Sequence, residues 1–303
     1  MQLQDPLYRA ARSLTGLSIG DAFGECFFGN SEIIQANLAT QTVPEGPWLF
    51  TDDTIMAIAV FRELCIDGNI NPDRLMQRFI RNHDADPHRG YGATLRRLLR
   101  ETAEGGDYRQ LAAAAFDGQG SAGNGAAMRV APVGAWYYND LEKIRELTTI
   151  ATLVTHTHPE ALQGALAVSI AVGLATKAGR EKNVPSPVAF LGAVAEQLEP
   201  SATKQKIIQS TRLDASMHIA TVAGVLGNGV TMLSQDTVPF ALWCAAHNLQ
   251  QFDQALWRAV SALGDRDTIC AITGAVTIMS SDINTVPANW LEKTENWECS
   301  VFN

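Results

Sequence analysis

The sequence lacks both a cysteine framework and an excess of basic residues. It forms no CxxC pair, and its five cysteines are widely scattered: Cys26, Cys65, Cys244, Cys270 and Cys299. In a chain of 303 residues this odd set predicts reduced thiols and a cytoplasmic protein. The formal net charge of −9 argues against general nucleic-acid binding, because such proteins present basic faces to phosphates.

Uninterrupted apolar runs are also short. A membrane span needs about 18–20 predominantly apolar residues. The longest charge-free stretch, between Asp214 and Asp236, is interrupted by His218 and three glycines. We interpret it as a broken pair of buried helices and predict a soluble chain with no membrane partner. The first dozen residues carry Asp5 and two arginines and no signal-peptide run.

Helical periodicity, in contrast, is found almost everywhere. Hydrophobic residues make up 46% of the chain, enough for a substantial core. Strand patterns are hard to find, and no Pro-, Ser- or Gly-rich linker divides the sequence. Apolar residues recur at three- to four-residue spacing in residues 7–17, 55–64, 73–81, 94–103, 140–154, 160–177, 187–198, 204–223, 236–247, 252–262 and 268–280. The sequence predicts one all-α domain over residues 1–303.

Two segments more than two hundred residues apart share one pattern. Residues 51–54 (TDDT) and 265–268 (DRDT) each place two carboxylates and a threonine at the start of an apolar helix. Acidic residues favour helix N-termini, so ordinary capping is the alternative interpretation of either segment alone. The two segments together favour a shared site.

If both helix starts converge, four carboxylates and two hydroxyls line one pocket. Four buried anions repel one another, and desolvation opposes their ionisation. Two divalent cations would balance the four negative charges, and an all-oxygen donor set suits Mg²⁺ first and Mn²⁺ second. The residues predict a metal centre with two ions held by Thr51, Asp52, Asp53, Asp265, Asp267 and Thr268.

A glycine-rich segment, residues 116–125 (FDGQGSAGNG), runs into the helix-forming stretch AAMRVAP. Its backbone N–H groups would suit a phosphate at a helix start. It is neither a Walker A loop nor a Rossmann fingerprint. Taken alone, these residues favour a flexible loop over a phosphate cradle.

Residues 155–159 (THTHP) hold two of the six histidines. An HxH pair can bind zinc, but no cysteine or third histidine lies nearby, which disfavours a zinc site. We expect a histidine here to contact a polar ligand, with a solvent-facing His158 as the alternative. The turn at residues 86–92 (DPHRGYG) predicts an exposed Tyr91 beside a ligand.

Together these segments resemble the ADP-ribosylglycohydrolase family. The likeness runs in order through GLSIGDAFGE (16–25), FTDDTIMA (50–57), DPHRGYG (86–92), FDGQGSAGNGAAMRVAP (116–132), VTHTHPEALQGALAV (154–168) and GDRDTICAITGAV (264–276). The resemblance implies an all-helical domain with a binuclear Mg²⁺ centre. It also implies that ADP-ribose, free or on a modified protein, lies across a cleft with its distal ribose on the metals.

The resemblance also assigns residues. The metal ligands would be the six oxygen donors named above. His156 would contact the nucleotide side of the ligand, Phe116 would pack against the ligand, and the diphosphate and distal ribose would meet Gly120, Ser121, Gly123 and Asn124.

Two positions depart from the family pattern. Many relatives carry a mobile glutamate four residues after the last glycine of GDAxG, where this chain has Phe28. We expect Glu25 to replace it and to act with Asp53 and Asp267 as the catalytic set; Glu32 is the alternative. Serine-type relatives stack adenine on a tyrosine where Ala122 stands here, so adenine needs another platform.

Two functions remain open. The first is a Mg²⁺-dependent hydrolase that removes ADP-ribose from a protein side chain or small acceptor. The second is a non-catalytic ADP-ribose binder on the same scaffold, which the absence of a glutamate at position 28 keeps open. A metal-dependent hydrolase of another phosphorylated sugar would leave the glycine-rich segment unexplained. The motifs do not distinguish serine, arginine, polymer or acetyl-ester acceptors.

Overall fold

The computed structural model describes residues 4–299, and within them the chain forms helices and no β-sheet. The predicted all-α fold is confirmed; residues 1–3 and 300–303 of the predicted domain lie outside the described range. The α-helices are α1 (Pro6–Glu25), α2 (Ser31–Thr40), α3 (Asp52–Asp67), α4 (Pro72–Ala85), α5 (Ala93–Ala103), α6 (Tyr108–Ala114), α7 (Ala131–Trp136), α8 (Leu141–Leu153), α9 (Pro159–Glu181), α10 (Pro187–Glu196), α11 (Ala202–Ser210), α12 (Ile219–Leu226), α13 (Ser234–Ala246), α14 (Phe252–Val260), α15 (Arg266–Thr277) and α16 (Ala288–Lys293). Short 3₁₀ helices are η1 (Asn124–Arg129), η2 (Ile283–Thr285) and η3 (Trp297–Cys299).

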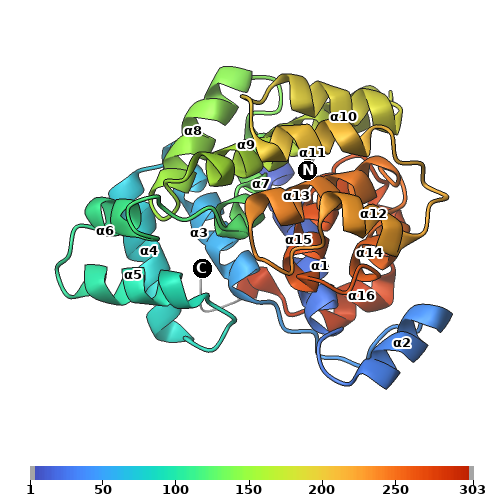
Figure 1. Cartoon of the computed structure of the whole chain (residues 1–303), viewed down its shortest axis with the longest axis horizontal. Coiled ribbons are helices and arrows are strands. Elements are labelled where there is room, and N and C mark those ends of the chain that lie inside the picture. Colours follow the sequence, from blue (N-terminus) through green and yellow to red (C-terminus); the bar gives the residue numbers. More distant parts are fainter. Residues whose placement is uncertain (1–3, 300–303) are drawn as a thin grey trace.

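The centre of the fold is the close contact of α1 with α15, the first and the last long helices (Figure 1). Three glycines of α1, four residues apart, face the α15 backbone. A Cβ atom at Gly20 would lie 2.1 Å from the Cys270 carbonyl oxygen, and one at Gly24 would lie 2.3 Å from that of Arg266. At the other end, Gly16 meets Gly274 in the same way. Only glycine permits this approach, which fixes the position of the α15 N-terminus.

The long helix α9 crosses the core beside η1, α7 and α8. It is long and apolar enough to span a membrane by length and composition, but 83% of its apolar window is buried within the fold. Its alanines and glycines, such as Ala167 and Ala171, allow neighbouring helices to pack on several sides. Helix α9 is therefore a buried core helix, as its alanine-rich sequence predicts.

The predicted helices over residues 204–223 and around 214–236 are wrong in detail. The chain leaves the helix at Thr211 and turns through residues 212–217 before α12. The Asp214 side chain accepts a hydrogen bond from the Ser216 amide at 2.8 Å, a local turn that competes with helix. Residues 227–233 then form a loop that begins at Gly227, whose φ is +96°. The stretch thus holds one short, partly exposed helix instead of two buried ones.

Candidate functional site

The two acid-bearing segments meet in one cavity of about 560 Å³. Thr51 caps α3, because its hydroxyl accepts a hydrogen bond from the Asp53 amide at 3.3 Å. Asp265 is the N-cap residue of α15. The cavity is lined by eleven of the thirteen predicted site residues: Asp52, Asp53, Phe116, Gly120, Ser121, Gly123, Asn124, His156, Asp265, Asp267 and Thr268. Thr51, buried behind Asp52, and Glu25 lie outside this lining.

Asp21, which was not among the predicted site residues, holds the start of α3 in place. Its buried carboxylate accepts hydrogen bonds from the Thr51 amide at 3.1 and 3.0 Å and from the Thr51 hydroxyl at 2.9 Å. It also accepts from the amide and hydroxyl of Thr54, at 3.0 and 2.6 Å. Since Asp21 belongs to α1, which is locked to α15 by glycine contacts, it links the two acid-bearing helix starts.

Asn124 ties the glycine-rich segment to the same cluster. Its Nδ2 donates to Asp265 Oδ2 at 2.5 Å and to Thr237 Oγ1 at 2.9 Å. Its backbone amide donates to the Met232 carbonyl oxygen at 2.9 Å. Three segments distant in sequence therefore meet at the carboxylates.

A fourth segment, residues 86–92, closes over Asp52. The Arg89 carbonyl accepts a hydrogen bond from the Asp52 amide at 2.6 Å. At Gly90, whose φ is +94°, a Cβ atom would lie 3.1 Å from Asp52 Oδ1. Tyr91 is buried against His83, with ring centroids 5.1 Å apart, so the predicted exposed aromatic is wrong. This turn therefore covers the start of α3.

Burial and mutual repulsion raise the pKa values of four carboxyl groups at this site. Desolvation and the charge of Asp267 raise the pKa of Asp21 to about 7 and that of Asp265 to about 8. For Asp52 and Asp53 the pKa lies well above the usual range, first because of desolvation and then because of the neighbouring aspartates. Ionising these carboxyl groups together therefore costs free energy, which a bound cation would offset.

The donor chemistry of this cluster fits a hard divalent cation. Buried carboxylate oxygens normally find a partner, yet Asp53 Oδ2 and Asp267 Oδ1 are buried without a hydrogen bond. Within residues 4–299, no three His, Cys, Asp or Glu side chains are arranged as a ready-made metal site. The fit therefore rests on the oxygen-only donors and the two unpartnered oxygens.

The glycine-rich segment is a strained loop, not a regular helix start. Phe116 and Asp117 adopt positive φ values of 53° and 56°, which are costly for residues other than glycine. At Gly120 a Cβ atom would lie 2.0 Å from Thr157 Oγ1, so only glycine fits there. Phe116 is 58% exposed at the edge of the cavity. This close packing contradicts a merely flexible loop.

His156 lies beneath that loop, and His158 does not join it. The Nδ1 atom of His156 is 2.6 Å from Thr155 Oγ1, whereas His158 Nδ1 accepts from the Glu160 amide at 3.1 Å as the cap of α9. Desolvation, and then the positive charge of Arg129, lowers the pKa of His156 to about 3. A neutral, buried histidine with its ring occupied in this way does not suit an HxH zinc site.

The two candidate glutamates after Gly24, and Phe28 between them, lie in different surroundings. Glu25 ends α1 and is exposed, yet desolvation and the charge of Asp267 raise its pKa to about 7. Phe28 packs under the guanidinium group of Arg266, whose Cζ atom lies 4.6 Å from the centroid of the phenyl ring. Glu32 lies on α2, which projects from the rest of the fold (Figure 1). The charge of Asp267 therefore acts on Glu25.

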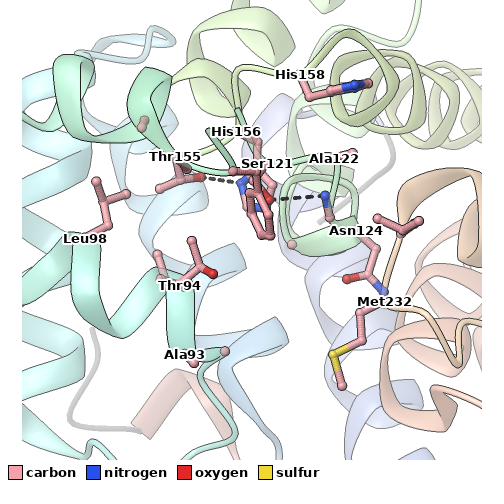
Figure 2. Close-up of a pocket in the computed structure, with 18 of the residues that line it drawn as sticks. Ala93, Thr94, Leu98, Ser121, Ala122, Asn124, Thr155, His156, His158 and Met232 are labelled. Atoms are coloured by element: carbon pink, nitrogen blue, oxygen red, sulfur yellow. Dashed lines mark hydrogen bonds between the residues drawn. The ribbon is translucent and has the colours of Figure 1, made fainter. Parts of the chain in front are cut away.

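The remaining walls of the cavity are mainly apolar. Figure 2 shows Ala93, Thr94 and Leu98 of α5 on one side and Met232 on the other, with His156 between them. Met232 is 64% exposed and has a φ of +56°. The cavity thus joins an acidic end to an apolar wall, an arrangement that suits an elongated ligand with polar and aromatic parts.

Comparison with known proteins identifies the family of the chain. The family model described as ADP-ribosylglycohydrolase matches residues 2–301. Human ADP-ribosylhydrolase ARH3 is 28% identical over 280 residues, covering 82% of this chain and 75% of the human protein. The ADP-ribosyl-[dinitrogen reductase] glycohydrolase of Rhodospirillum rubrum is 23% identical over 303 residues, covering 95% and 90%.

A solved structure shows the same fold. It is an ADP-ribosylglycohydrolase-related protein complex, with a TM-score of 0.68, 24% identity, and coverage of 96% of this chain and 94% of the other. The family match spans nearly the whole chain, in agreement with the motifs that the structure brings together at the cavity. The chain therefore belongs to the ADP-ribosylglycohydrolase family, a family of hydrolases.

Proposed function

We propose that this protein is a Mg²⁺-dependent hydrolase that releases ADP-ribose from a modified protein side chain or small acceptor. The observation that carries the proposal is the convergence of the α3 and α15 N-termini in one cavity. Two unpartnered buried oxygens there, on Asp53 and Asp267, favour cation binding. The free thiols at positions 26, 65, 244 and 270 support a cytoplasmic location.

In this proposal the metal ligands are Thr51, Asp52, Asp53, Asp265, Asp267 and Thr268, with two Mg²⁺ ions as the cofactor and Mn²⁺ as a substitute. Divalent ions bound there supply positive charge that orients the ribose hydroxyls and lowers the pKa of a nearby water. Asn124 holds Asp265 in position, and Asp21 holds the start of α3. Hydrolysis at the anomeric carbon passes through an oxocarbenium-like state, which carboxylates stabilise.

Glu25 moves the proton in this scheme. Its pKa of about 7 lets it both accept and donate a proton near neutral pH. It directly follows Gly24, where a Cβ atom would lie 2.8 Å from Asp267 Cα, so its side chain starts close to the aspartates. Phe28 has no proton to transfer and packs against Arg266 instead.

The ligand follows the length of the cavity. The distal ribose would lie at the aspartates and the diphosphate over Gly120, Ser121 and Gly123, while the adenosine part would reach the apolar wall. Leu98 and Met232 of that wall offer adenine the contact that Ala122 cannot provide.

A turnover assay tests this function. Purified protein is incubated with serine-linked and arginine-linked ADP-ribosylated peptides, each with Mg²⁺ or with EDTA, and free ADP-ribose is measured. Release from either peptide that depends on Mg²⁺ supports the hydrolase and identifies the preferred acceptor. Tight binding of ADP-ribose without release from any linkage would establish the non-catalytic binder instead.

A further inference from the structure

Arg129 is a completely buried cation that the proposed chemistry does not use. It ends η1, directly after the glycine-rich segment, and has no exposed surface. Within residues 4–299 it forms no ion pair with a carboxylate. Its guanidinium group instead lies over the Phe79 ring, 4.7 Å from the centroid. Burying a charge costs free energy unless hydrogen bonds compensate for it, so the hydrogen-bond partners of Arg129 matter.

One of those bonds reaches the histidine of the cavity through a threonine. Arg129 Nη2 donates to the Ala151 carbonyl and to Thr155 Oγ1, both at 2.7 Å. Thr155 Oγ1 is in turn 2.6 Å from His156 Nδ1. The three side chains form a chain that runs from the core to the cavity, and Figure 2 shows its last link.

The order of the donors favours one position for the imidazole proton. The arginine can only donate, so the Thr155 oxygen accepts from it and has its single proton left to give. The nearest partner for that proton is His156 Nδ1. An Nδ1 atom that accepts a hydrogen bond carries no proton, so the ring proton lies on Nε2.

The Nε2 atom points at the glycine-rich segment. It would lie 3.3 Å from a Cβ atom at Gly123 and 3.2 Å from one at Gly125. The absence of side chains at both positions leaves the approach to Nε2 open. His156 lines the cavity, and the described residues provide no hydrogen bond to Nε2.

We propose that Arg129 and Thr155 are positioning residues that hold His156 as a neutral imidazole, with its Nε2–H directed at the diphosphate or nucleotide part of the ligand. The identity of the ligand rests on the proposed function; the state of the ring does not. Burial and the positive charge of Arg129 disfavour a second proton on the ring. The cation thus acts at a distance, through the threonine.

The ring state is tested first, without any ligand. Long-range ¹H–¹⁵N spectra of the full-length protein, labelled at histidine, report which nitrogen of His156 carries the proton. We expect Nε2–H at neutral pH in the wild type and in Thr155→Ser, which keeps the hydroxyl. In Thr155→Val, which keeps the shape, the Nδ1 signal should shift or the two tautomers should mix. A wild-type ring protonated on Nδ1, or on both nitrogens, would overturn the proposal.

The same variants are then titrated with ADP-ribose by calorimetry. Thr155→Val should weaken binding about three- to tenfold, the size of one net hydrogen bond, and Thr155→Ser should restore it. Equal melting temperatures would separate this loss from misfolding. Unchanged affinity in Thr155→Val, or equal weakening in both variants, would overturn the proposal. If the wild type binds no ADP-ribose, the proposed function fails, and the spectra alone still decide the state of His156.

Discussion

The carboxylate of Asp21 accepts both the backbone amide and the hydroxyl of Thr51, thirty residues later in the chain. Through this contact α1 positions the N-terminus of α3. The same helix is held against α15 by Gly20 and Gly24. Helix α1 therefore sets the distance between the two groups of aspartates. Substitution of Asp21 tests this role.

Replacing Asp21 by Asn should destabilise the protein. Both carboxylate oxygens accept from a backbone N–H, of Thr51 or Thr54, and a backbone N–H cannot reverse its direction. The amide group of Asn would therefore face at least one donor. We expect a loss of about 1–3 kcal/mol in the free energy of unfolding, measured by urea denaturation.

Asp5→Asn is the matched control for this change. Asp5 caps α1 by accepting from the Leu7 amide at 2.9 Å on the surface, where Asn caps equally well. Its stability should remain close to that of the wild type. Equal stability of the Asp21 and Asp5 variants would contradict the structural role of Asp21.

The stability of the chelator-treated protein should fall as the pH rises. The pKa of Asp21 is raised to about 7 and that of Asp265 to about 8, from an ordinary value of 3.8 in the unfolded chain. Between these values the folded state binds more protons than the unfolded state, so the free energy of unfolding decreases with increasing pH. Melting temperatures between pH 5 and 8 measure this, and Mg²⁺ should stabilise most at pH 8. A flat or rising profile with EDTA would contradict the raised pKa values of Asp21 and Asp265.

Much of the site, but not its support, could be predicted from the sequence. The TDDT and DRDT segments could be recognised because helix N-termini and paired acidic residues have local sequence signatures. Asp21 sits inside an ordinary helical run, and only the tertiary structure reveals that Thr51 and Thr54 donate to it. The helix break after Ser210 likewise depends on a local turn at Asp214 that periodicity does not reveal. The close approach of Gly20 and Gly24 to α15 also depends on a helix far away in the sequence, so the tertiary structure alone reveals it.

Replacing Glu25 by Gln should lower kcat by roughly 10²–10⁴, the usual contribution of a positioned acid or base. ADP-ribose affinity should persist, because Glu25 lies outside the cavity lining. Steady-state kinetics and calorimetry separate these two effects. Glu32→Gln, on the projecting helix α2, is the control and should change little. A large loss in Glu32→Gln alone would transfer the role to that residue, and no loss in either would leave Glu25 without one.

Replacing Gly123 by Val should block the ligand and spare the metal. Gly123 has φ −62° and ψ 162°, which valine can adopt, so the backbone is not strained. Its Cβ atom would lie 3.2 Å from Ser121 Oγ and 3.3 Å from His156 Nε2, filling the space over the loop. ADP-ribose affinity should fall by about tenfold or more in calorimetry. Gly192→Val, where a Cβ atom meets nothing within 4 Å, is the control. An unchanged affinity would remove this loop from the binding site.

The most direct measurement is the rate of ADP-ribose release as Mg²⁺ is added back to chelator-treated protein, for the wild type and for Asp267→Asn. Asp267 contributes a buried, unpartnered oxygen at the start of α15, and Asn keeps its size without its charge. We expect the wild type to be inactive with EDTA and to recover with Mg²⁺ or Mn²⁺, gaining thermal stability by about 2.7 kcal/mol at a hundredfold excess over Kd. Asp267→Asn should remain folded but gain neither activity nor thermal stability when Mg²⁺ is added. A wild type that works at full rate in EDTA, or an Asp267→Asn variant with full activity, would contradict a metal centre at these aspartates.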